Sequence, residues 1–254
     1  MSRLTILIYG IASYLLFLVT FLYGIGFIGG IAVPTSLDAA PKRPLGTALA
    51  IDLGLLSLFA VQHSGMARPA FKRWWTRIVP ESAERATYVL LSSLAMIALY
   101  ALWQPIGGIL WSVNSDFGRE AVLGLYFFGW LLLLYATFLI DHFDLFGLKQ
   151  VWRQFRGRPY IAPQFHTPGL YRLVRHPLYV GWLIIFWAAP VMTFAHLVFA
   201  LMTTAYILVA IRFEEKDLAD AFGDDYLRYR SRTGMLLPKL PAPDSQETWR
   251  AAED

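Results

Sequence analysis

The chain alternates between long stretches without a charged side chain and shorter segments that carry most of its charge. Asp, Glu, Lys and Arg are absent from 4–37, 86–115, 121–140 and 177–211. A helix needs about 20 apolar residues to cross a bilayer, and each stretch reaches that length. Backbone polar groups in lipid must find partners within the chain, so runs of this length indicate helices. A membrane barrel would show alternating segments of about ten residues instead.

This pattern predicts an all-α, polytopic transmembrane bundle of about six helical segments. We place these segments at 5–32, 46–62, 86–111, 119–146, 177–192 and 195–213. Pro105, Gly107 and Gly108 are expected to end the third segment early, because proline and glycine disrupt a helix interior. A tight turn around Pro190 divides the last uncharged stretch into a helical hairpin.

The basic residues predict the orientation of the bundle. Segments 63–85 and 148–176 are rich in Lys and Arg, whereas the connection 112–118 has neither. Cytoplasmic loops carry an excess of Lys and Arg, so six passes with both termini inside put both basic loops on the cytoplasmic face. The expected location is the bacterial inner membrane. The lipid bilayer is one expected partner, and basic loops of this kind also attract anionic lipid.

Composition agrees with this class and narrows the chemistry. Hydrophobic residues make up 57% of the chain and charged residues only 16%, against about 25% charged in soluble domains. Cysteine is absent, which excludes disulfides, cysteine nucleophiles and cysteine metal ligands. No closely spaced histidine pair is present, so no metal site is expected. No nucleic-acid partner is expected, and the oligomeric state is left open.

Candidate chemistry concentrates where the fifth segment begins. Pro177 is a favourable first helical residue, which places His176 near the N-cap. A helix N-terminus offers free N–H groups and a partial positive charge, and Arg175 adds a full charge. Such a place suits a carboxylate or a phosphate.

Two glutamates follow the sixth segment on the same expected face. Glu214 and Glu215 would close that helix, where acidic groups oppose the helix dipole and therefore need a compensating cation. A ligand ammonium group would supply it, and so would Arg212 as a simple neighbour. Together, a cationic helix start and an acidic helix end fit a zwitterionic amino-acid group.

The residues from Gly169 to Tyr226 resemble a known superfamily. The pattern of Gly, Tyr, Arg-His-Pro, Tyr and Gly over 169–181, followed by Glu-Glu, Leu, Phe-Gly and Tyr over 214–226, is similar to that of the isoprenylcysteine carboxyl methyltransferases and phospholipid methyltransferases. These are membrane enzymes that use S-adenosylmethionine. The resemblance implies a cofactor-binding set of Gly169, Tyr171, Arg175, His176, Pro177, Tyr179, Glu214 and Glu215.

With this site at the C-terminal end, we divide the chain as one membrane domain and a tail. The domain covers 1–240, with N-terminal spans in 1–150 and a cofactor-binding core in 151–240 that faces the cytoplasm. The remainder, 241–254, is expected to be a polar tail.

Further motifs indicate a branch of the superfamily. Segments 61–68, 141–148 and 165–171 resemble the bacterial methanethiol S-methyltransferases, which make dimethyl sulfide, and related membrane proteins found near nitric oxide reductase genes. The resemblance implies S-methylation of a small thiol substrate. Alternatives are methylation of a phospholipid or an isoprenylcysteine, or a non-catalytic membrane protein linked to nitrogen-oxide metabolism.

A thiol reacts as its thiolate, so a base that accepts the thiol proton is expected. Ionisable groups at membrane depth are costly and tend to be functional. The candidates are His142, His63 and Asp144, which we place at the cytoplasmic ends of the second and fourth segments. On one continuous helix, Asp141 and Asp144 would share a face and His142 would point elsewhere. The role of Asp52, inside the second segment, is left open.

Overall fold

Helices account for most of residues 2–239, which the computed structural model describes; the predicted polar tail, 241–254, lies outside these residues. The long helices are α1 (Arg3–Gly29), α2 (Leu45–Ala67), α4 (Glu81–Leu102), α5 (Asp116–Leu139) and α9 (Phe194–Phe222). The short ones are α3 (Pro69–Trp75), α6 (His142–Leu145), α7 (Leu148–Phe155), the 3-10 helix η1 (Gly169–Arg172), α8 (Pro177–Trp187) and α10 (Asp224–Arg232). Two short strands complete the fold, β1 (Ile109–Ser112) and β2 (Val191–Thr193).

The predicted membrane bundle is confirmed, with one helix shorter than expected. Within residues 2–239, five helices are long and apolar enough to cross a membrane, namely α1, α2, α4, α5 and α9. Helix α8 has 11 residues, or roughly 16 Å at 1.5 Å per residue, about half of the hydrocarbon thickness. The protein is therefore an integral membrane protein in which α8 is an apolar helix too short to cross the bilayer.

Several predicted helix ends are wrong, each for a local reason. The third segment does end early, at Leu102, ahead of Pro105. The fourth ends at Leu139 and not at 146, because Asp141 adopts a left-handed conformation with φ 77°. The last helix continues to Phe222, beyond the predicted 213, since Glu, Lys, Asp and Ala are compatible with a helix and the apolar stretch does not mark its end.

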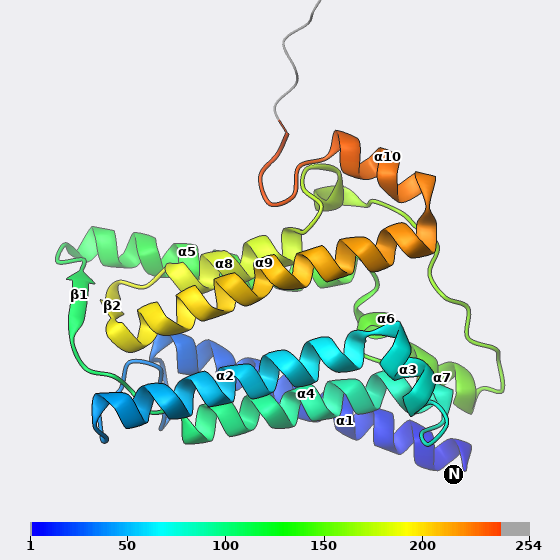
Figure 1. The fold of residues 1–254 in the computed structure, drawn as a ribbon, viewed down its shortest axis with the longest axis horizontal. Coiled ribbons are helices and arrows are strands. Elements are labelled where there is room, and N and C mark those ends of the chain that lie inside the picture. Colours follow the sequence, from blue (N-terminus) through cyan, green and yellow to red (C-terminus); the bar gives the residue numbers. More distant parts are fainter. Residues whose placement is uncertain (1, 240–254) are drawn as a thin grey trace, which may run out of the picture.

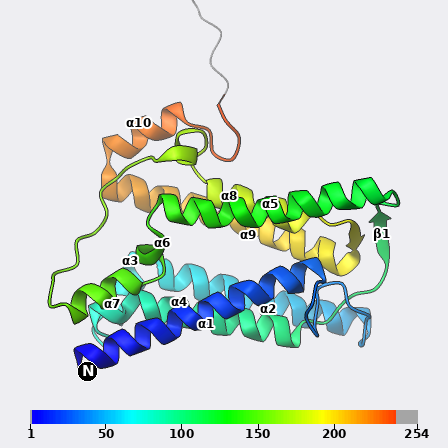
Figure 2. The same cartoon turned by 180° about the vertical axis from the view of Figure 1, so that it is seen from behind.

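The long helices form two layers (Figures 1 and 2). Helices α1, α2 and α4 make one layer, and α5, α8 and α9 make the other. The N-terminus, α3, α7 and the C-terminal part of α9 lie at one end of the molecule. Both basic segments, 63–85 and 148–176, are therefore at that end, here called the basic end.

A small antiparallel ribbon joins the layers at the opposite end (Figure 1). Strand β1 pairs with β2, with Ile109 opposite Thr193 and Ser112 opposite Val191. The prediction of helix through 111 is wrong at this point. Gly108, with φ 93°, lies in a left-handed region that favours glycine and turns the chain from α4 into the strand.

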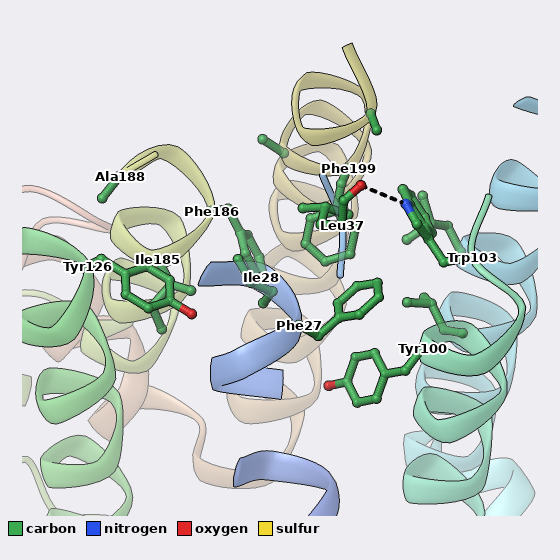
Figure 3. Packing of buried hydrophobic residues seen from close by; sticks show 14 of the residues in the cluster. Phe27, Ile28, Leu37, Tyr100, Trp103, Tyr126, Ile185, Phe186, Ala188 and Phe199 are labelled. Carbon is green, nitrogen blue, oxygen red and sulfur yellow. Dashed lines mark hydrogen bonds between the residues drawn. The ribbon is translucent and has the colours of Figure 1, made fainter. Parts of the chain in front are cut away.

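Aromatic side chains fill the core between the layers (Figure 3). Phe27 of α1 lies 4.7 Å from Tyr100 of α4, measured between ring centroids. Trp103 crosses to Phe199 of α9 at 5.7 Å, and its indole N–H donates to the Leu37 carbonyl at 3.2 Å. Offset and edge-on aromatic pairs of this kind each add about 0.5–1.5 kcal/mol beyond area burial.

Asp52 has a structural partner in this region. Its carboxylate, fully buried on α2, accepts a hydrogen bond from the backbone N–H of Gln104 at 2.8 Å. Gln104 follows α4, so the carboxylate fixes the chain where that helix ends. The second Asp52 oxygen has no hydrogen-bond partner among the described residues.

Helices α5 and α8 pack closely because glycine lies at their contact. A Cβ atom at Gly181 would meet Leu133 Cβ at 2.9 Å and the Gly129 carbonyl oxygen at 3.0 Å. We expect Gly181→Ala to destabilise the protein by about 1–3 kcal/mol, the usual cost of overpacking. Gly124→Ala is the matched control, since a Cβ there meets nothing within 4 Å. Thermal unfolding in detergent compares the two, and an equal midpoint for both variants would contradict this packing.

Candidate functional site

A buried ion-pair cluster joins the start of α8 to the C-terminal part of α9. Glu215 accepts hydrogen bonds through one carboxylate oxygen from Arg175 Nε at 2.7 Å and from His176 Nε2 at 3.1 Å. The side chains of Arg175 and Glu215 are only 11% and 13% exposed. Arg175 and His176 come directly before Pro177, the first residue of α8, so this cluster sets where that helix begins.

Glu214 differs from its neighbour because its carboxylate reaches the surface. Its side chain is 44% exposed, and one oxygen accepts a hydrogen bond from the Tyr179 hydroxyl at 2.9 Å. His176 Nδ1 lies 3.9 Å from the same oxygen. Glu214 is thus a held but accessible negative charge next to the first turn of α8.

The predicted position of the two glutamates at a helix end is wrong. Helix α9 continues to Phe222, so Glu214 and Glu215 lie in its interior and the argument from the helix dipole does not apply to them. Their compensation comes from Arg175, His176 and Tyr179. The prediction that the two motifs meet is confirmed by these contacts.

Arg175 is also less available than its sequence position suggests. Its guanidinium donates to Glu215 and, through Nη1, to the carbonyls of Arg230 at 3.2 Å and Thr233. Its backbone N–H donates to the Gly234 carbonyl at 2.8 Å. The expectation that Arg175 offers a free charge to an anion therefore gives way to a different role, which is to hold the segment after α10 against the start of α8.

The remaining predicted cofactor residues surround this cluster. Pro177 opens α8 and is fully buried. Gly169 begins η1 with φ 50°, where a Cβ would meet Leu139 at 3.1 Å, so a tight turn accounts for glycine there. The carbonyl of Tyr171 accepts a hydrogen bond from Tyr229 of α10. Burial raises the pKa of Tyr171, and the nearby Glu214 carboxylate raises it further, which places the Tyr171 phenol near Glu214.

Two further tyrosines, Tyr88 of α4 and Tyr206 of α9, lie near the same carboxylate. The Tyr88 hydroxyl lies 2.8 Å from His63 Nε2, and Tyr206 accepts a hydrogen bond from Ser64 at 3.1 Å. His63 therefore reaches the Glu214 region through Tyr88. Sequence reasoning missed both tyrosines, because isolated tyrosines in apolar helices look like core residues.

An ion pair ties the two layers together near this region. Arg68, which follows α2, lies 3.0 Å from Asp217 of α9. Its guanidinium also lies over the Phe213 ring at 5.3 Å. The side chains of Arg68 and Asp217 are both about one-third exposed, so solvent partly screens this ion pair. The pair serves mainly to align α2 with α9.

His142 lies in a separate cluster. Its Nδ1 is 2.8 Å from Thr137 Oγ1, and its Nε2 is 2.9 Å from the Tyr14 hydroxyl. Because the Thr137 hydroxyl donates to the Leu134 carbonyl at 2.7 Å, it must accept from Nδ1. Both nitrogens of His142 are thus engaged in hydrogen bonds. Its contacts are with α1 and α5 and not with Glu214.

Asp144 belongs to the same short helix and has its own partner. The predicted continuous helix through 146 is wrong, so the predicted sharing of a face is also wrong: Asp141 caps α6 by accepting from the Asp144 N–H at 3.1 Å. Asp144 and His142 are both buried. The Tyr160 hydroxyl donates to Asp144 at 3.0 Å, and burial together with this carboxylate raises the pKa of Tyr160 to about 12.

Burial of His142 predicts a pH dependence of stability. Burial lowers the pKa of His142 below its ordinary 6.5, although the charge of Asp141 acts in the opposite direction. The His142 imidazole then binds a proton more readily in the unfolded chain than in the folded protein. The contribution of His142 to stability is therefore full above pH 6.5 and is lost as the pH falls below that value. We expect the midpoint temperature of thermal unfolding to decrease when the pH is lowered from about 7.5 to about 5.5. The decrease should be smaller in His142→Asn. The control His166→Asn, at an exposed residue, should follow the parent. An identical pH dependence in His142→Asn and the parent would contradict the prediction.

Comparison with known proteins agrees with this architecture. The family model for phospholipid methyltransferase matches residues 125–225, which include the whole Arg175–Glu215 cluster. No solved structure matches. Apolar spans with one half-length helix, and a buried charged cluster that joins the start of α8 to α9, define an integral membrane protein.

The most informative similarities are to named enzymes. The chain is 51% identical to the methanethiol S-methyltransferase of Crocosphaera subtropica, over 94% of this chain and 93% of that protein. It is 52% identical to the methanethiol S-methyltransferase of Mycobacterium tuberculosis, over 94% and 98% respectively. Nurim of Xenopus laevis is 33% identical over 74% of this chain and 67% of that protein. The chain belongs to the methanethiol S-methyltransferase family of membrane methyltransferases.

Proposed function

We propose that this protein transfers a methyl group from S-adenosylmethionine to methanethiol, giving dimethyl sulfide. The observation that carries the proposal is about 50% identity to methanethiol S-methyltransferases over nearly the whole chain. The site supports it, since Glu214 presents an accessible carboxylate beside the first turn of α8.

The residues around Glu214 fit the amino-acid part of such a donor. A partly exposed carboxylate held by Tyr179 suits an ammonium group. The first turn of α8 has backbone N–H groups without helical partners and a partial positive charge, which suit a carboxylate. The aromatic faces of Tyr171 and Tyr179 suit a sulfonium cation.

We assign distinct roles within the predicted cofactor set. Glu214 and the first turn of α8, which Pro177 opens, bind the donor together with Tyr179, and Tyr171 lines the site. Arg175, His176 and Glu215 hold the donor-binding residues in place, and Gly169 permits the turn before them.

When bound, S-adenosylmethionine would supply the methyl group to the thiolate sulfur, and its own sulfur would leave as the neutral thioether of S-adenosylhomocysteine. The protein must align the thiol and exclude water. The protein must also accept the thiol proton or stabilise the thiolate.

His63 is the base that the contacts favour. It hydrogen-bonds to Tyr88, which lies near Glu214, whereas His142 and Asp144 contact other residues. We expect His63→Gln to lose turnover while binding S-adenosylmethionine as the parent does. Raising the pH should restore part of the rate, because the thiol then ionises in solution. His142→Asn and Asp144→Asn are the comparison variants. Full turnover of His63→Gln at neutral pH would exclude His63 as the base.

Phospholipid methylation is a second candidate, supported by the family model that matches 125–225. Methyl-labelled S-adenosylmethionine with purified protein separates the two functions. Methanethiol, phosphatidylethanolamine vesicles and a prenylated cysteine are offered in parallel, and label is counted in volatile and lipid fractions. We expect label only in the volatile product. Label in lipid would overturn the thiol assignment, and no label anywhere would indicate a non-catalytic protein.

We also propose that the basic end faces the cytoplasm across the bacterial inner membrane. Arg and Lys are concentrated in 63–85 and 148–176 at this end, as expected for cytoplasmic loops. The chain has no cysteine, so the variant Gln164→Cys carries a single thiol whose accessibility to a reagent can be measured in intact cells. Labelling by a membrane-impermeant maleimide only after lysis supports this orientation; labelling in intact cells would reverse it.

A further inference from the structure

A basic cavity, separate from the Glu214 site, lies along α7 at the basic end. Its volume is about 430 Å³, and its lining residues are Lys149, Trp152, Arg153, Arg156 and Arg158. No acidic side chain lines this cavity within residues 2–239. One lining residue, Lys149, forms an ion pair with Asp141, which lies outside the cavity lining.

The fold builds the cavity by turning the chain sharply after α7. Gly157 has φ 66°, a left-handed conformation that favours glycine. The Arg158 N–H donates to the Arg153 carbonyl at 2.9 Å, and Arg153 Nη1 donates to the Pro159 carbonyl at 3.0 Å. A Cβ at Gly157 would lie 2.8 Å from Arg3 Nη1, so the first residue of α1 adds its charge to this turn.

Two of the guanidinium groups are free to bind a ligand. Within residues 2–239, the side chains of Arg156 and Arg158 form no hydrogen bond or ion pair, and Arg156 lies over the Trp152 ring at 5.8 Å. Planar guanidinium groups bind phosphate oxygens in pairs of hydrogen bonds. A site with two such groups and a neighbouring ammonium suits a phosphate ester.

The position of α7 indicates where that phosphate ester comes from. Val151 is fully buried, and its Cγ2 lies so near α1 that a Cβ at Gly10 would meet it at 2.6 Å. Helix α7 therefore lies against the first turns of a membrane span. Trp152 and Phe155 face outward, 52% and 37% exposed, as aromatic residues do at the membrane–water interface.

We propose that this cavity binds the headgroup of an anionic phospholipid, with Arg156 and Arg158 on its phosphate and Trp152 at the level of the glycerol. Basic pockets beside membrane spans bind such headgroups. The proposal is independent of the methyl-transfer chemistry, since it uses none of the residues around Glu214.

Retention of lipid by the purified protein tests this site. The full chain is reconstituted in phosphatidylcholine with a minority of phosphatidylglycerol and extracted in mild detergent, and its bound lipids are quantified by mass spectrometry. We expect phosphatidylglycerol to be enriched among the lipids bound to the parent. In the double variant Arg156→Gln with Arg158→Gln, each arginine removed should weaken retention of this lipid roughly fivefold. The matched control is Arg230→Gln with Arg232→Gln, two exposed arginines on α10 at the same end.

Three outcomes would overturn the proposal. These are equal retention by the parent and the Arg156/Arg158 variant, equal losses in the variant and the α10 control, and displacement of the lipid by dilute inorganic phosphate, which would indicate a site for the free ion. If the double variant does not fold, Arg158→Gln alone is measured in the same way, and retention equal to that of the parent overturns the proposal.

Discussion

Glu214→Gln is expected to weaken binding of S-adenosylmethionine by about 10- to 100-fold, the loss of one hydrogen bond to a charged group. The substitution removes the negative charge but keeps an oxygen that accepts from Tyr179, and the side chain is 44% exposed. The fold should therefore be unaffected. Isothermal titration calorimetry in detergent measures the change.

The matched control for this loss of charge is Asp225→Asn. Asp225 is an exposed carboxylate at the same end of the molecule and pairs only with Arg228 among the described residues. Its substitution should leave the affinity unchanged. An unchanged affinity in Glu214→Gln would mean that Glu214 does not bind the donor.

The adjacent substitution, Glu215→Gln, should act on stability instead. It leaves the Arg175 guanidinium, 11% exposed, without its counter-charge, and it weakens the contact with His176. Removing one partner of a buried ion pair costs about 3–5 kcal/mol. We expect a clearly lower midpoint of thermal unfolding in detergent for Glu215→Gln and a parental midpoint for Glu214→Gln. Equal midpoints for the two variants would contradict the separation of roles.

This contrast between neighbours could not be predicted from the sequence. Both glutamates follow the last apolar stretch and look equivalent there. Successive residues on a helix point in directions about 100° apart, so Glu215 faces Arg175 and His176 while the partly exposed Glu214 faces Tyr179. Only the packing of α8 against α9 decides which carboxylate is buried.

The membrane spans, in contrast, were predictable because the bilayer imposes a strong requirement on composition. The uncharged stretches 4–37 and 121–140 correspond to α1 and α5. Helix ends were less predictable. Helix α9 extends past its apolar part into Lys216 and Asp217, where the ion pair from Arg68 supports it, and that partner is about 150 residues distant in sequence.

The candidate site was predictable in its local motifs and not in its long-range partners. Arg175, His176 and Pro177 combine a charge with a favourable helix start, which sequence shows directly. Tyr88 and Tyr206 join the site only because α4 and α9 place their rings near Glu214. The hydrogen bonds of His142 likewise come from Tyr14 and Thr137, which no spacing in the sequence reveals.

The most direct test of the proposed function is the formation of dimethyl sulfide by purified protein in detergent. Parent and Glu214→Gln proteins receive S-adenosylmethionine and methanethiol, and headspace gas chromatography follows the product. We predict dimethyl sulfide from the parent, at a rate strongly reduced in Glu214→Gln. The absence of dimethyl sulfide from a parent protein that binds S-adenosylmethionine would contradict methanethiol as the acceptor, and equal rates would contradict Glu214 as the donor-binding residue.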